Sequence, residues 1–241
     1  RALLLAAHAA VRSGEVGEAR RYLSALDELP GERVPESLAG RAEVVRGAVD
    51  VVELRLEAAL DRLERLRLDP LDRPWLAESW VWRGRAFARL GRIDEAWAAF
   101  DFAISEEGGL RLPLAAERAP ISLDAGRPNE TAASLEVLLA TRAGAPWIDT
   151  VLAVARRAER RMGPGLAAEF LEPARSDAWP ARPRDRVLLA QVQLLLAAGD
   201  TAAADENLAW LAEGSTEGAV SARLARARLH LAGALEFAER V

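Results

Sequence analysis

Residues 80–103 have the sequence WVWRGRAFARLGRIDEAWAAFDFA and form the most informative segment of the chain. Apolar side chains recur at helical spacing on both sides of Gly91, and Ala, Arg, Leu and Glu are good helix formers. Glycine is favoured just after a helix, because it adopts a left-handed backbone conformation without a clash of Cβ. The segment therefore predicts two helices joined by a tight turn at Gly91.

An apolar helical segment followed by glycine recurs along the whole chain. The glycines in this position are Gly14, Gly47, Gly91, Gly126, Gly163, Gly199 and Gly233, at successive spacings of 33, 44, 35, 37, 36 and 34 residues. A period in the mid-thirties with two helices per period is typical of a helical repeat array. In the longest interval we expect a helix over residues 51–68 and then a proline-containing turn over residues 69–74. No stretch shows the alternating pattern of a β-strand.

Segment 80–103 closely resembles a tetratricopeptide repeat, a two-helix unit of about 34 residues. The large, small and turn positions of that family hold Trp80, Gly84, Phe87, Gly91, Ala96, Phe100 and Ala103. Arg83 departs from the pattern, since leucine is usual there, and Gly108 stands where the unit normally ends in proline. The resemblance is looser elsewhere but covers the chain. It implies an all-α, right-handed superhelical solenoid of about seven antiparallel helix pairs, in one domain over residues 1–241 with a kink or soft boundary near 69–75. Another two-helix repeat of similar period is the alternative.

Composition argues against several classes of function. The 241 residues carry 32 basic and 37 acidic side chains, and the formal net charge of −5 disfavours direct binding to nucleic acid. The chain has no cysteine and no lysine, and its two histidines, His8 and His230, lie near opposite ends. A nucleophilic triad, a clustered metal site and a P-loop are therefore not expected. No apolar run reaches the ~18 residues that a membrane-spanning helix needs. We expect a cytoplasmic protein that is not an enzyme and has no catalytic, metal-binding or cofactor-binding residues.

The resemblance also implies where a partner binds. Tetratricopeptide repeats bind ligands on a concave wall formed by the first helix of each pair. The corresponding candidates here are Arg12, Arg41, Arg85, Arg89, Arg156 and Arg160, with Trp82 as an exposed aromatic anchor. Arginine binds carboxylates through two parallel hydrogen bonds, so these residues favour an acidic peptide or a C-terminal carboxylate. The alternative is that the arginines pair with nearby glutamates on a solvated surface.

These patterns predict a non-enzymatic scaffold that binds a protein or peptide on its concave face. The alternative is the sensor or effector region of a larger bacterial transcription regulator, since such proteins carry degenerate helical repeats. Abundant alanine and the use of arginine in place of lysine indicate a GC-rich bacterial genome. The chain begins and ends within helical patterns, so we expect an excerpt whose uncovered apolar faces favour a homo-oligomer.

Overall fold

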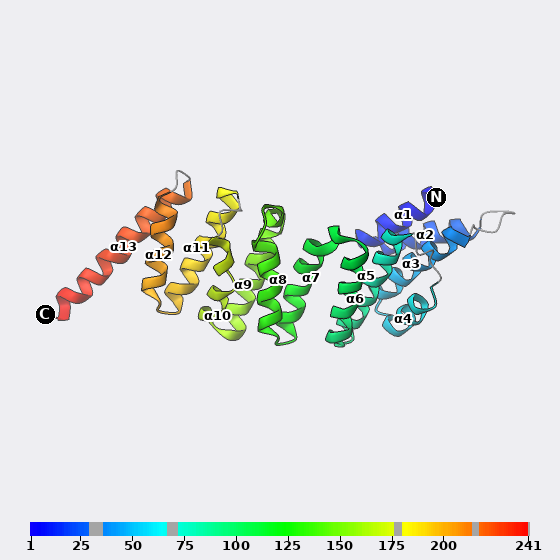
Figure 1. Cartoon of the computed structure of the whole chain (residues 1–241), viewed down its shortest axis with the longest axis horizontal. Coiled ribbons are helices and arrows are strands. Elements are labelled where there is room, and N and C mark those ends of the chain that lie inside the picture. The colour runs from blue at the N-terminus through cyan, green and yellow to red at the C-terminus, as the bar shows by residue number, and fades with distance from the viewer. Residues whose placement is uncertain (29–35, 67–71, 176–179, 214–216, 241) are drawn as a thin grey trace. The chain divides into compact units, whose positions relative to one another are not determined.

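The computed structural model describes residues 1–28, 36–66, 72–175, 180–213 and 217–240, which form helices joined by turns (Figure 1). No β-strand occurs among these residues, so the all-α prediction is confirmed. The chain divides into two compact units between Arg111 and Leu112. The kink or boundary expected near residues 69–75 falls inside the first unit, and residues 69–71 lie outside the described part.

The first unit consists of consecutive helix pairs. Its described helices are α1 (Ala2–Arg12), α2 (Val16–Asp27), α3 (Glu36–Val52), α4 (Leu56–Glu64), α5 (Arg73–Arg89), α6 (Ile93–Glu106) and the short 3-10 helix η1 (Gly108–Leu110). Each helix contacts the next, and the first helices of successive pairs also touch, α1 with α3 and α3 with α5. The elements α1, α3 and α5 therefore form one face of the unit and define what we call its first-helix face.

The pairs of the first unit share one turn geometry. Gly14, Leu54 and Gly91 have positive φ angles of 83°, 63° and 77°. The residue after each of them donates its backbone N–H to the carbonyl five residues earlier: Glu15 to Ala10 (2.8 Å), Arg55 to Asp50 (2.9 Å) and Arg92 to Phe87 (2.9 Å). This bond closes the end of the first helix in the same way each time, because it satisfies a carbonyl that has no partner within the helix.

Two predictions about this unit are wrong. Gly47 does not mark a turn, because it lies inside α3. The helix expected over residues 51–68 is interrupted at its start, since the turn at Leu54 separates α3 from α4 and α4 begins at Leu56. Leu54 is a turn residue with an apolar side chain, so the sequence pattern placed it within a helix.

Gly47 is the small residue at a close contact between paired helices. A Cβ on Gly47 would lie 2.7 Å from Cδ2 of Leu63 in α4. The same relation holds in the next pair, where a Cβ on Gly84 would lie 2.5 Å from Cε1 of Phe100. Both glycines precede the turn of their pair by seven residues, so the two pairs pack their helices by the same device.

The second unit contains α-helices and short 3-10 helices, and its first helix begins at Arg111. They are α7 (Arg111–Asp124), α8 (Pro128–Leu139), η2 (Arg142–Trp147), α9 (Ile148–Met162), α10 (Pro164–Glu169), η3 (Glu172–Arg175), α11 (Ala181–Ala197), α12 (Thr201–Ala212) and α13 (Glu217–Arg240). Within this second unit α9 contacts α11 and α11 contacts α13, again linking alternate helices. The elements α9 and α11 therefore form the first-helix face of this unit.

The predicted turns of the second unit are partly confirmed. Gly126 and Gly199 have φ angles of 71° and 81° and end α7 and α11 as expected. Gly163 has a φ of 92° with an extended ψ of 165°, and α10 begins directly after it. The break expected at Gly233 is wrong, because this residue lies within the continuous helix α13.

Each unit has a hydrophobic cluster of its own. In the first unit the cluster centres on small and aliphatic residues such as Ala7, Val45 and Leu63. In the second it surrounds a polar contact that ties three helices together: Gln191 of α11 donates to the carbonyl of Ala168 (3.1 Å) and accepts from Asn207 of α12 (3.2 Å). Both side chains are buried, so each needs these bonds to offset its loss of water.

Candidate functional site

A largely buried carboxylate, Glu78 of α5, lies on the first-helix face of the first unit and contacts α1. Its Oε1 accepts a hydrogen bond from Nε1 of Trp82 (2.9 Å) and lies 2.9 Å from Nε2 of His8 in α1. The His8 ring packs on Trp75, with centroids 4.9 Å apart. Burial raises the pKa of Glu78, but the hydrogen bond and charge of His8, the charge of Arg12 and the bond from Trp82 together outweigh it, so this pKa lies below its ordinary value.

Two of the predicted arginines extend this cluster. Nε of Arg41 in α3 donates to Oδ2 of Asp72 at 2.6 Å, and its guanidinium lies 5.9 Å from the ring centroid of Trp75. The guanidinium of Arg85 lies 4.4 Å from the ring centroid of Trp82. Cations over indole rings are held by the ring quadrupole. Both arginines therefore already have partners inside the unit.

Trp82 is not the exposed anchor that the sequence predicted. Its side chain is 4% exposed, covered by Arg85 and bonded to Glu78. The exposed aromatic surface of this unit is elsewhere: Phe102 of α6 is 53% exposed and stacks on Trp80, with centroids 4.8 Å apart.

The other two arginines predicted in the first unit differ in their contacts. Arg89 is exposed, and its Nη1 donates to the backbone carbonyl of Val51 near the end of α3. This bond satisfies a carbonyl at a helix terminus, which is a structural role. Arg12 is exposed in the last turn of α1 and acts on Glu78 through its charge.

The first-helix face of the second unit has a hollow instead of a filled cluster. Its volume is about 170 Å³, and it is lined by Leu152, Ala155, Arg156 and Glu159 of α9 and by Ala190, Gln193 and Leu194 of α11. Ala155 and Leu194 are buried and form the floor, whereas Arg156 and Gln193 are exposed at the rim. The hollow therefore combines an apolar floor with a polar edge. The sequence prediction did not include the residues of α11. A signal was present, because Gln193 follows the buried Val192 just as Arg156 follows the buried Ala155.

The arginines of α9 divide into two sets. Arg157 and Arg161 pair with Asp124 of α7, at 2.7 and 3.1 Å. Arg156 and Arg160 are exposed, and neither forms an ion pair with any residue that the structure describes. The structure thus brings Arg156 to the hollow and places Arg160 one helical turn further along the same side of α9.

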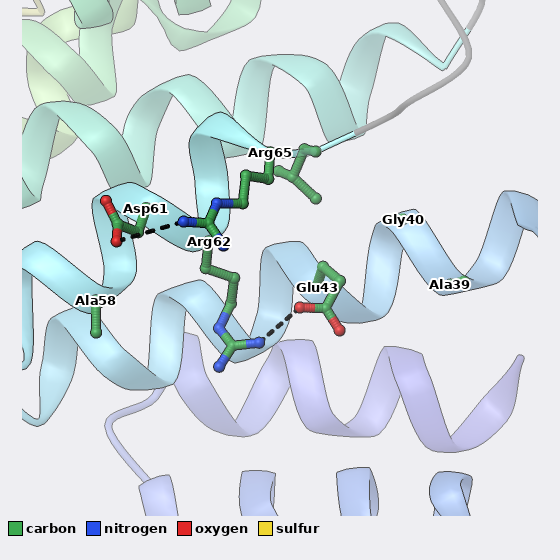
Figure 2. Close-up of a pocket in the computed structure, with 8 residues that line it drawn as sticks. Ala39, Gly40, Glu43, Ala58, Asp61, Arg62 and Arg65 are labelled. Atoms are coloured by element: carbon green, nitrogen blue, oxygen red, sulfur yellow. Dashed lines mark hydrogen bonds and ion pairs between the residues drawn. The ribbon is translucent and has the colours of Figure 1, made fainter.

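A larger pocket of about 570 Å³ lies between α3 and α4, and its lining includes none of the predicted residues (Figure 2). Its lining residues are Ala39, Gly40, Glu43, Ala58, Asp61, Arg62, Arg65 and Leu66. Figure 2 shows the charged side chains pointing toward one another: Arg62 bonds Glu43 at 2.7 Å, and Arg65 lies 3.9 Å from Asp61. All four charges of this pocket therefore have a partner in the chain.

This pocket borders a continuous chain of alternating charges. Its members, in order of contact, are Arg20, Glu53, Arg55, Asp50, Arg62, Glu43, Arg46 and Asp27. They come from α2, α3, α4 and the turn at Leu54. Asp50 is the buried centre, 5% exposed, and accepts from Nε of Arg55 (2.9 Å) and Nε of Arg62 (3.0 Å). The network holds neighbouring helix pairs together, which is a structural function.

Metal sites and membrane-spanning helices are not found in the described part of the chain. Within those ranges, no group of three or more His, Asp or Glu side chains is placed to hold a metal ion. No single described helix is both long and apolar enough to cross a bilayer; α8 and the segment Arg142–Met162 reach the length only together, and they are bent by 119°. No protein-family model, no curated protein and no solved structure matches the chain.

Proposed function

We propose that this chain is a non-enzymatic helical-repeat module that binds a protein or peptide on its first-helix faces. The observation that carries the proposal is the hollow between α9 and α11, which has an apolar floor and two arginines without carboxylate partners beside it. Binding surfaces on helical repeats use preformed helices and a few anchoring contacts, and arginine is enriched at such contacts. An acidic partner complements these two charges.

Selection of peptides from a random library tests this function and requires no identified partner. The 241-residue chain is immobilised and the library is selected on it, with the bare support as control. Amide hydrogen exchange then maps the best enriched peptide. Protection on α1, α3, α5, α9 or α11 supports the proposal. No enrichment over the support, or protection confined to α2, α4, α6, α8, α10 and α12, contradicts it.

We further propose that the helix pairs follow one another as a right-handed superhelical solenoid related to tetratricopeptide repeats. The recurring turn geometry and the contacts between alternate helices within each unit support this proposal. A compact 241-residue domain has a radius of gyration of about 18 Å. Small-angle X-ray scattering of the chain is expected to give a clearly larger radius, and a value near the compact one contradicts a solenoid.

A further inference from the structure

The two first-helix faces differ in whether their polar groups are already occupied. In the first unit the potential anchors bond each other: Glu78 with His8 and Trp82, and Arg41 with Asp72. A ligand there must break these contacts and leave partly buried charges without partners, which costs more than a new contact returns. The first unit is therefore closed to a ligand at this cluster.

The hollow of the second unit has the opposite character. Its volume of about 170 Å³ is below the ~300 Å³ at which pockets for whole small molecules begin. That space suits a single aliphatic side chain, placed against Ala155 and Leu194. Burying such a side chain contributes about 1.5–3 kcal/mol.

The charged residues around the hollow determine which ligand residues can flank that aliphatic side chain. Arg156 stands at its rim and Arg160 one turn away, and neither has an ion-pair partner in the described part of the chain. Glu159 and Gln193 add an acceptor and an amide that can bond the backbone of an extended peptide. An aliphatic residue flanked by carboxylates satisfies both the apolar floor and the arginines.

We infer that the ligand binds the second unit and not the cluster around Glu78, and that it is a linear peptide with one aliphatic side chain between acidic residues. The aliphatic side chain enters the hollow between α9 and α11, and the carboxylates bond Arg156 and Arg160. This inference rests on the proposed function and specifies its location and its ligand. It assigns the cluster around Glu78 to the stability of the first unit.

Three synthetic pentapeptides test the ligand chemistry: Gly-Asp-Leu-Asp-Gly, Gly-Asp-Ala-Asp-Gly and Gly-Arg-Leu-Arg-Gly. They are titrated into the isotope-labelled chain, and binding is followed by amide chemical shifts. The first peptide is expected to perturb α9 and α11 and to lose affinity with added salt. The alanine peptide is expected to bind about tenfold or more weakly, because it leaves the hollow unfilled. Equal affinity for all three peptides contradicts the inference.

Two pairs of variants test the location. Ala190→Leu fills the hollow and is expected to weaken binding of the leucine peptide about tenfold or more, whereas the matched control Ala153→Leu changes an exposed alanine of α9 outside the hollow. Arg156→Glu with Arg160→Glu is expected to weaken binding by a similar factor, whereas Arg12→Glu reverses an exposed charge of the first unit. Both controls are expected to change affinity less than about twofold.

The outcomes separate this inference from the proposed function. Loss of binding in Arg12→Glu, with binding retained in the Arg156→Glu, Arg160→Glu variant, moves the site to the first unit and overturns the inference alone. Retained binding in Ala190→Leu also overturns it, because the hollow is then not the site. Failure of the library selection to yield any peptide overturns the proposed function itself.

Discussion

Gly84 and Phe100 are packed so closely that a Cβ on the glycine would lie 2.5 Å from Cε1 of the ring. Phe100 is fully buried, so its ring cannot move aside without disturbing its neighbours. The same relation between Gly47 and Leu63 shows that this close approach is a repeated feature of the first unit. Both contacts join the first helix of a pair to the second.

Substitution of Gly84 by alanine tests this contact. Gly84→Ala is expected to lower the free energy of unfolding by about 1–3 kcal/mol, because the added methyl overpacks the interface. Gly17→Ala is the matched control, since Gly17 lies in α2 with no heavy atom within 4 Å of the added Cβ. It is expected to leave stability unchanged or raise it by about 0.5 kcal/mol. If urea denaturation shows that Gly84→Ala and Gly17→Ala lower the free energy of unfolding equally, the space around Gly84 is not limiting.

Leu54 is expected to be a site of stored backbone strain. Its φ of 63° is unfavourable for a residue with a Cβ, and its side chain is 68% exposed, so little packing offsets the cost. Leu54→Gly is expected to raise the free energy of unfolding by up to about 1 kcal/mol. The reverse change at the equivalent turn, Gly91→Ala, is expected to lower it by a similar amount. A destabilised Leu54→Gly protein in thermal unfolding would contradict this account.

The charge network predicts a large difference between two aspartates. Asp50→Asn is expected to cost about 1.5–3 kcal/mol, because a buried carboxylate that accepts from two guanidinium groups is lost. Asp61→Asn removes an exposed carboxylate 3.9 Å from Arg65 and is expected to cost less than about 0.5 kcal/mol. Guanidinium chloride would screen both contacts, so urea is the denaturant to use. Similar costs for the two variants would mean that the network does not act as a unit.

The cluster around Glu78 predicts a pH dependence of stability. Because the folded pKa of Glu78 lies below its ordinary value of 4.5, the unfolded chain takes up this proton more readily than the folded one. The contribution is therefore complete above pH 4.5 and is lost as the pH falls through the folded pKa. Glu78→Gln is expected to lose less stability than the parent on acidification, measured by urea unfolding along a pH series. Trp82→Phe, which removes one hydrogen bond to Glu78, should fall between the two, and parallel curves for all three proteins would exclude Glu78 as the source.

The outer face of α13 predicts self-association. Val220, Leu224 and Leu231 are 55%, 60% and 64% exposed, and their spacing of four and seven residues places them on one side of the helix. We expect this stripe to pair with the same stripe of a second copy. Sedimentation velocity should show a concentration-dependent increase in mass that Leu224→Glu with Leu231→Glu abolishes. Ala232→Glu, an exposed change directly after Leu231 and on a different side of the helix, should leave association intact, and a parent protein that stays monomeric would refute the pairing.

The all-helical class and most turns could be predicted because glycine and helical periodicity are local signals. The prediction failed where one residue type occurs in two structural roles. Gly47 fits both a turn and a close helix contact, and only the position of Leu63 distinguishes them. Leu54 gives no signal of a turn, because its left-handed backbone is imposed by the helices on both sides. Because the turn of this pair lies at Leu54 and not at Gly47, the repeat positions assigned to α3 were also shifted. Arg41 therefore corresponds to Glu78, since each lies six residues before the glycine of its pair, Gly47 or Gly84.

The candidate site was harder to predict than the fold. Every basic side chain other than histidine is an arginine, so the sequence does not show which of them have partners. Arg157 and Arg161 bond α7, whereas Arg156 and Arg160, a single residue away in each case, do not. Burial of Trp82 likewise depends on residues distant in the sequence, because it belongs to the hydrophobic cluster that contains Ala7 of α1 and Val45 of α3. Such differences arise from tertiary contacts, which periodicity does not encode.

The separate hydrophobic clusters of the two units have a practical value. The variants at Gly84, Leu54, Asp50 and Glu78 all lie in the first unit, whereas those at Ala190 and Arg156 lie in the second. Amide hydrogen exchange reports local opening residue by residue, so it can compare a substituted unit with the unsubstituted unit of the same molecule.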